Sequence, residues 1–283
     1  MRRKRRRPKK PKEFPRRWKI SIVIAACGVV CLGGLAYGGH GLRKWVSSQE
    51  AFRVNSVLLE YSPESIPAAV TAELKEVSSR QGGTSMFDPS LLVTMKRGYE
   101  ESGWVKEVTW VRKSFPDTVE CRLQLREPCG AVLSKSYYLT DFDGIRLPGE
   151  YREWPCEGFD VPMITGTRGV IPSVGTKWND DSVKAAVEVL KEFAGLEVAK
   201  ALKIKSIDVS NLGGKVNRSA SEIVLRTGDG TEIWWGRRPG STRMGERSSS
   251  AKVGELNEIV QEDSIEKYRY IDLRFEPAVK MLR

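Results

Sequence analysis

The first forty residues constrain this 283-residue chain most, because a dense block of charge stands directly before a stretch with none. Twelve of the 47 Lys and Arg residues lie in the first nineteen positions, where Glu13 is the only acid. Ile20 to Gly39 then carries no charged residue. The remaining residues hold 35 basic and 35 acidic side chains, so the net charge of +11 resides in the tail. The composition therefore gives no indication of a basic, nucleic-acid-binding domain.

The uncharged run predicts a transmembrane helix at 20–40. About twenty helical residues rise roughly 30 Å, the thickness of a bilayer's hydrocarbon core. Trp18 on one side, with Tyr37 and Trp45 on the other, suit the aromatic belts at the two membrane interfaces. Positive charge before the run predicts a cytoplasmic tail at 1–19 and an extracytoplasmic remainder. We therefore expect a single-pass membrane protein.

Three other interpretations of this region were weighed. A cleaved signal peptide has an apolar core of about 7–15 residues, shorter than this run, although Ala36-Tyr37-Gly38 could serve as a cleavage site. Ile24-Ala25-Ala26-Cys27 is similar to a lipobox, but the chain stays apolar beyond Cys27. A nucleic-acid role for the tail is the third. Such a charge run is usually a solvated arm, and beside an apolar stretch it orients the protein and attracts anionic headgroups. We prefer an anchor.

Few residues used by enzymes follow the apolar run. The only histidine, His40, lies at its edge, so no histidine-based triad or zinc cluster can form beyond it. Gly213-Gly214-Lys215 lacks the spacing of a P-loop, and Asp141-Phe142-Asp143-Gly144 fits a hairpin turn better than a calcium loop. We expect no enzyme, no cofactor and no metal. At most one disulfide can form among Cys121, Cys129 and Cys156, and the sequence does not say which two would pair.

Residues 50–128 are expected to form a compact unit with the order β-α-α-β-β. Alternating and helical spacings of apolar residues predict a strand, two helices and two further strands. The helices begin at Ser62-Pro63 and Asp88-Pro89, pairs that combine an N-cap with a first-turn proline. The last two strands flank a turn at Phe115-Pro116-Asp117. Two aromatic side chains are expected in the core, those of Trp104 and Trp110.

Residues 129–283 are expected to form a mostly antiparallel β domain with flanking helices. Hairpins are predicted around Asp143-Gly144 and Gly228-Asp229-Gly230, and an irregular surface stretch at 148–172. The last predicted strand, 268–275, alternates, with Ile271, Leu273 and Phe275 facing the core and Tyr270, Asp272 and Arg274 on the wetter face. The expected fold class is therefore α+β, with one N-terminal membrane helix followed by these two domains.

Five motifs, in order behind the tail and the apolar run, resemble those of the FtsQ/DivIB family of bacterial division proteins. The resemblance covers nearly the whole chain and includes the entry strand Phe52-Arg53-Val54-Asn55-Ser56-Val57. The motifs are Trp104-Val105-Lys106-Glu107-Val108-Thr109-Trp110-Val111-Arg112-Lys113-Ser114-Phe115-Pro116-Asp117-Thr118-Val119, Arg126-Glu127-Pro128, Val161-Pro162-Met163-Ile164-Thr165-Gly166, Trp235-Gly236-Arg237 and Tyr270-Ile271-Asp272-Leu273-Arg274-Phe275.

The resemblance implies a POTRA-like domain at 50–128 and a C-terminal β domain at 129–283. It also implies a scaffold without chemistry in the bacterial inner (plasma) membrane at the division septum. It implies FtsB-like and FtsL-like bitopic partners and other divisome proteins, with no nucleic acid and no small-molecule substrate. An open terminal strand can accept a partner strand. Glu276-Pro277 departs from the small turn common in the family, and proline lacks the N–H that a strand ladder needs. The sequence therefore does not identify which strand would pair with a partner. By position, the implied partner-binding residues are Tyr270, Asp272, Arg274, Phe275, Ala278 and Val279.

Two other function classes are compatible with this organisation. One is an envelope chaperone or transport module of the POTRA type. Such units occur as tandem repeats ahead of a barrel, and this chain shows no second copy. The other is a membrane-anchored enzyme, which would require a cluster of ionisable residues in a pocket.

Overall fold

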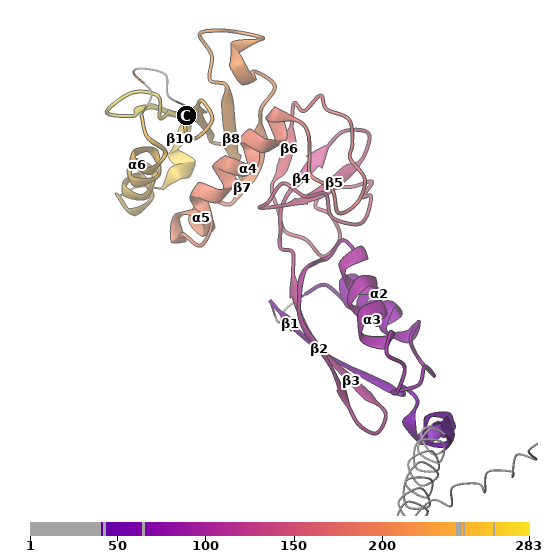
Figure 1. Cartoon of the computed structure of the whole chain (residues 1–283). Coiled ribbons are helices and arrows are strands. Elements are labelled where there is room, and N and C mark those ends of the chain that lie inside the picture. Colours follow the sequence, from indigo (N-terminus) through magenta and orange to yellow (C-terminus); the bar gives the residue numbers. More distant parts are fainter. Residues whose placement is uncertain (1–40, 42–43, 64–65, 242–244, 246, 263) are drawn as a thin grey trace, which may run out of the picture.

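The computed structural model describes residues 41, 44–63, 66–241, 245, 247–262 and 264–283. These residues form two lobes that follow one another along the chain (Figure 1). A three-stranded sheet belongs to the first lobe and an eight-stranded sheet to the second.

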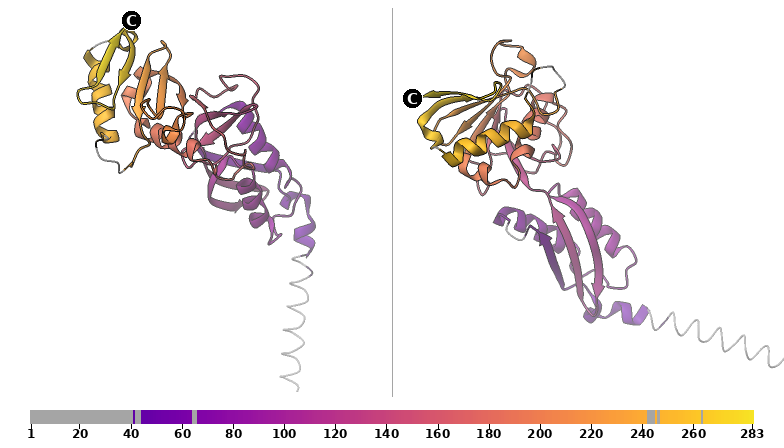
Figure 2. Two further views of the ribbon diagram at one scale, coloured as in Figure 1. Left: turned by 90° about the horizontal axis from the view of Figure 1, so that it is seen from above. Right: turned by 90° about the vertical axis from the view of Figure 1, so that its left-hand side faces the viewer.

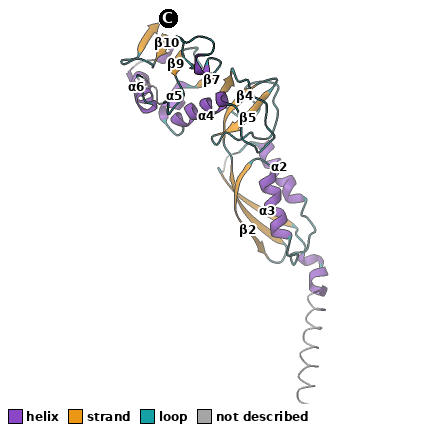
Figure 3. Cartoon of the chain, turned by 45° about the horizontal axis from the view of Figure 1, so that its top comes forward, coloured by secondary structure: helices purple, strands orange, loops and turns teal. Residues whose placement is uncertain are grey.

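The first lobe is a three-stranded sheet with two helices packed on one of its faces (Figure 3). The strand order is β1-β3-β2, with β1 parallel and β2 antiparallel to the central strand. The elements run β-α-α-β-β along the chain as β1 (Ser56–Ser62), α2 (Ala68–Ser79), α3 (Leu91–Glu101), β2 (Val105–Ser114) and β3 (Thr118–Leu125).

The two tryptophans expected in the first core lie on opposite faces of the sheet. Trp104 is buried, and its indole N–H donates to Glu73 at 3.0 Å. Burial raises the pKa of the Glu73 carboxyl, although the bond from Trp104 opposes this. The prediction for Trp110 is wrong: its ring is half-exposed, beneath the guanidinium groups of Arg112 and Arg122. Register shifts in β2 before Glu107 and Trp110 change which side chains face the helices.

The second lobe is built on an eight-stranded mixed sheet. The strand order is β11-β10-β9-β8-β7-β6-β4-β5. The strands are β4 (Pro128–Leu133), β5 (Tyr137–Asp141), β6 (Met163–Thr165), β7 (Ile204–Asp208), β8 (Ile223–Thr227), β9 (Glu232–Gly236), β10 (Tyr268–Asp272) and β11 (Val279–Leu282).

Helices cover one face of this sheet (Figure 2). They are α4 (Asp181–Phe193), α5 (Glu197–Leu202) and α6 (Ser249–Glu262), and α6 contacts both of the others. The α4 helix begins at Asp180, whose carboxylate accepts the Ser182 N–H at 2.8 Å. The helices and the inner face of the sheet share one apolar core, in which Trp235 is fully buried.

The expected fold class is corrected on two points. The described part of the chain contains no helix that is long and apolar enough to cross a membrane, and the expected transmembrane helix at 20–40 lies outside it. The sheet of the second domain is mixed: four of its seven strand pairs are antiparallel and three are parallel. The pairs β6–β7 and β9–β10 are parallel because the helices between their strands carry the chain back to the end of the sheet at which the first strand began. The class is α+β with mixed sheets.

The hairpin of β4 and β5 belongs to both cores. Ala131 and Leu139 pack into the core of the first lobe, whereas Val132 and Tyr138 pack into that of the second. Phe159, from the segment after the hairpin, stacks on Trp104 with ring centres 5.6 Å apart. The junction of the two lobes is therefore packed on both sides of one hairpin.

A buried ion pair closes this junction. Arg126 donates to the Asp141 carboxylate at 2.7 Å, and their side chains are 17% and 5% exposed. The other Asp141 oxygen accepts the N–H groups of Asp143 and Ile145 at 2.9 and 2.8 Å. The pair joins the short link between β3 and β4 to the turn that follows β5.

The three described cysteines carry no disulfide. Cys121, Cys129 and Cys156 are all buried and free. Burial raises the pKa of Cys121 to about 12 and also raises the pKa of Cys129 and of Cys156. All three are therefore protonated thiols at neutral pH, a form with little nucleophilic reactivity.

Replacing Arg126 by Gln should destabilise the protein by about 3 kcal/mol, because it leaves the buried Asp141 carboxylate without its cation. Denaturant unfolding followed by circular dichroism measures the loss. Arg122→Gln is the matched control, since Arg122 pairs with Glu60 at the surface, where both side chains are about half-exposed; it should cost at most about 1 kcal/mol. Equal losses for the two variants would contradict the assigned role of the junction.

Candidate functional site

Strand β11 forms an open edge of the large sheet. It pairs antiparallel with β10, and no described strand pairs with its other side. Every residue of β11 is exposed, including Val279 (45%), Met281 (43%) and Leu282 (63%). An edge of this kind presents unpaired N–H and C=O groups together with apolar side chains. We call β11 the open edge.

The opposite edge of the sheet is covered. Strand β5 pairs with β4 on one side, and the segment at 145–151 lies along it through bridges from Tyr137 to Tyr151 and from Thr140 to Arg146. The Leu147 N–H donates to the Leu139 carbonyl at 2.9 Å, which adds to this cover. The two edges of the sheet are therefore treated differently.

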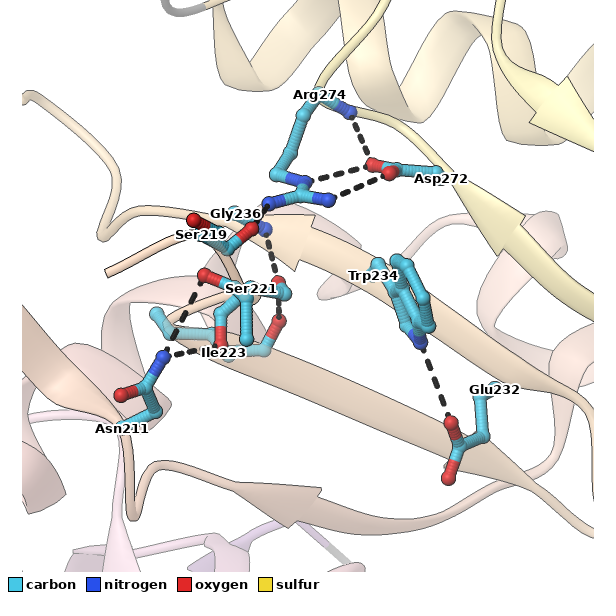
Figure 4. A network of polar contacts seen from close by, with 10 residues as sticks. Asn211, Ser219, Ser221, Ile223, Glu232, Trp234, Gly236, Asp272 and Arg274 are labelled. Carbon is cyan, nitrogen blue, oxygen red and sulfur yellow. Dashed lines mark hydrogen bonds and ion pairs between the residues drawn. The ribbon is translucent and has the colours of Figure 1, made fainter. Parts of the chain in front are cut away.

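A strip of large side chains runs across the outer face of the sheet to the open edge. Trp234 stacks flat on Tyr270, with ring centres 4.4 Å apart and planes 4° apart. Tyr270 lies opposite Met281 in the ladder between β10 and β11, and paired residues share a face. The Trp234 N–H donates to Glu232 at 3.2 Å (Figure 4). The strip is aromatic over β9 and β10 and aliphatic on the open edge.

Asp272 and Arg274 fix the chain where it leaves β10. Two guanidinium nitrogens of Arg274 donate to the two Asp272 carboxylate oxygens at 2.9 and 2.7 Å (Figure 4). A third donates to the Ser219 carbonyl at 2.8 Å. The guanidinium carbon also lies 5.6 Å from the centre of the Trp234 ring. Arg274 is therefore held within the protein, beside the strip.

A second ion pair holds the turn between β10 and β11. Arg247 pairs with Glu255 of α6 at 3.2 Å, with side chains 10% and 17% exposed. Arg247 donates to the Phe275 carbonyl at 2.7 Å, and the Ala278 N–H donates to Glu255 at 3.2 Å. Pro277 lies in this turn, outside the ladder, so its missing N–H takes nothing from the pairing of β10 and β11. We call Arg247 and Glu255 the turn clamp.

The six residues predicted to bind a partner have different environments. Phe275 (54% exposed) and Val279 are accessible, whereas Asp272 (3%) and Ala278 (7%) are buried. Tyr270 and Arg274 are half-exposed. Phe275 does not face the core, because the strand ends at Asp272 and the chain turns away. The side chain of Asp272 is buried despite its outward position because Arg274 lies over it.

Sequence reasoning missed other parts of this site. The sequence does not predict Met281 and Leu282 on a separate strand. Because Trp234 and Trp235 are neighbours on a predicted strand, the sequence indicates only that one of the two points outward. The alternation of Val279 with Met281 was the available signal for β11. No local pattern links Arg247 and Glu255 to a turn more than twenty residues away. Across the residues that the structure describes, no group of three or more His, Cys, Asp or Glu side chains could hold a metal ion.

No protein-family model matches this chain, and no curated protein matches it.

Replacing Glu255 by Ala should loosen the open edge without unfolding the protein. The change removes the acceptor of the Ala278 N–H and the nearer of the two acidic partners of Arg247. The loss is about 2 kcal/mol for a charged hydrogen bond. Amide hydrogen exchange of residues 279–282 should then accelerate roughly thirtyfold. Glu258→Ala, an exposed carboxylate on the same helix, is the control and should leave this exchange unchanged. Unchanged exchange in Glu255→Ala would show that the turn clamp does not hold β11.

Proposed function

We propose that this chain is a non-catalytic scaffold that binds partner proteins by β-strand addition at β11. The open edge carries the proposal, because its exposed apolar side chains and unpaired backbone groups are what an added strand requires. Backbone hydrogen bonds would supply affinity, and the alternating side chains would supply specificity.

The strip beside the open edge supports the same function. Aromatic side chains and arginine are enriched among the residues that contribute most to protein interfaces. Trp234, Tyr270 and Arg274 are held by stacking and by hydrogen bonds, so little side-chain entropy is lost when a partner covers them. The added strand would lie along β11, and a neighbouring part of the partner would cover the strip.

More particularly, we propose that the scaffold belongs to the bacterial division machinery, at the inner membrane of the septum, with the described lobes on the extracytoplasmic side. This step rests on the motifs that resemble the FtsQ/DivIB family. The arrangement of two motifs is in keeping with it: Arg126 of Arg126-Glu127-Pro128 closes the junction, and Asp272 and Arg274 fix the end of β10. The proposed partners are FtsB-like and FtsL-like bitopic proteins and other divisome proteins.

Val279→Lys tests the proposal, because a charge on an exposed edge strand opposes pairing with another strand. Full-length protein carrying the change is mixed with the FtsB-like and FtsL-like proteins encoded by the same genome, and the retained partner is quantified. We expect at least a tenfold loss of binding, with thermal unfolding unchanged because the side chain is exposed.

Val170→Lys is the matched control, since Val170 is an exposed valine in the loop between β6 and α4, and four strands separate β6 from β11 in the sheet. It introduces the same charge and should leave binding intact. Equal binding by the wild type and Val279→Lys would overturn strand addition at β11. Failure of the wild-type protein to retain either division protein would overturn the division role.

A further inference from the structure

A second candidate site lies in the large lobe, away from the open edge. A cavity of about 790 Å³ opens where the end of α4, the α5 helix and the start of β7 meet the segment at 154–162. Its apolar lining includes Phe142, Trp154, Leu190, Phe193 and Ile204. Strands β8, β9 and β10 separate β7 from β11 in the sheet. We call this cavity the α5 groove.

Three lysines line the α5 groove, against one acidic side chain, that of Asp160. Lys200 pairs with Glu197 at 2.8 Å. Lys203 and Lys205 are exposed, and within the described ranges neither makes an ion pair. The Lys205 side chain runs beside Gly228, which also lines the groove. The groove therefore joins an apolar lining to two uncompensated positive charges.

Lys203 occupies a backbone conformation that usually requires glycine. It ends α5 with φ 44° and ψ 56° and is the only described non-glycine residue with a positive φ. Its carbonyl accepts the Gly228 N–H at 2.9 Å, which fixes the turn between β8 and β9 beside the groove. Glycine would adopt this conformation with less strain, so the backbone alone does not account for a lysine at this position.

We propose that the α5 groove binds an acidic linear segment of a partner protein, which inserts a bulky apolar side chain between carboxylates. The apolar lining would take the inserted side chain, and Lys203 and Lys205 would pair with acids on either side of it. The chain's own N-terminal tail is excluded as the occupant, because twelve positive charges in nineteen residues oppose these lysines. The cavity is open to solvent, as an extended peptide requires.

The test measures binding of one defined probe to the full-length chain. The probe is a fluorescein-labelled nine-residue peptide with Trp-Leu at its centre and Asp or Glu elsewhere, and binding is followed by fluorescence anisotropy. A second peptide replaces every Asp and Glu by Asn and Gln. We expect Lys203→Glu/Lys205→Glu to weaken the acidic peptide about tenfold, since two surface ion pairs are lost, and to leave the neutral peptide unaffected.

The control must allow for the basic tail, which attracts any acidic peptide. Lys135→Glu/Lys215→Glu changes the net charge by the same amount at two exposed sites outside the groove and should weaken binding less than twofold. Equal weakening by the two double variants, or equal affinity for the acidic and neutral peptides, would overturn the proposal. Complete displacement of the acidic peptide by sodium oleate would also overturn it, in favour of an anionic amphiphile.

Lys203→Gly supplies a readout that general destabilisation cannot imitate. Glycine relieves the left-handed backbone, so the thermal midpoint should rise while the affinity for the acidic peptide falls severalfold. Unchanged affinity, or lower stability together with lower affinity, would show that Lys203 is retained for folding and would overturn its role in binding.

Discussion

The arrangement of the second lobe depends on one buried carboxylate, that of Asp141. It accepts Arg126 on one oxygen and two backbone N–H groups on the other, so its charge is compensated where water is nearly excluded. Arg126 immediately follows β3, and Asp141 ends β5. The ion pair thus fixes the position of the short link between the first sheet and the second. The shared hairpin of β4 and β5 then sets where the remaining strands add.

The second sheet extends from this hairpin to β11, an edge that no described strand covers. At β5 a neighbouring segment supplies the cover that edge strands usually receive. At β11, by contrast, the turn clamp holds the turn that precedes the strand, and the ion pair of Arg274 with Asp272 holds the end of β10. Arg283 adds a third hold: its N–H donates to the Lys267 carbonyl and its guanidinium to the Asp229 carbonyl. The result is an edge that is ordered and accessible at once.

The first lobe was the easier part to read from the sequence, because its signals are local. Apolar residues at helical spacing require no knowledge of distant segments. The predicted helix starts at Ser62-Pro63 and Asp88-Pro89 are wrong, because the helices begin later, at Ala68 and Leu91. The core position predicted for Trp110 is wrong because the alternation of apolar and polar side chains along a strand does not reveal a β-bulge. In the second lobe, β6 has only three residues and lies within a stretch rich in proline and glycine, so it read as irregular. Its place between β4 and β7 comes from long-range pairing alone.

The candidate site could be predicted from the sequence only where its signals are local. Phe275 and Val279 were singled out by position and are exposed, whereas the burial of Asp272 depends on how Arg274 folds back over it. The strip depends on the register between β9, β10 and β11, which no single segment encodes. The α5 groove was unreadable because α5 itself was not predicted, and the left-handed Lys203 follows from its end.

The hairpin shared by both cores has a mechanical consequence. Arg126 and Glu127 are the only residues between β3 and β4, and packed side chains flank the link on both sides. A force applied to β11 would therefore act across the strands of the sheet and would reach the first lobe through packed side chains and an ion pair. Because this junction is packed and has only a two-residue link, a displacement of one lobe should also move the other.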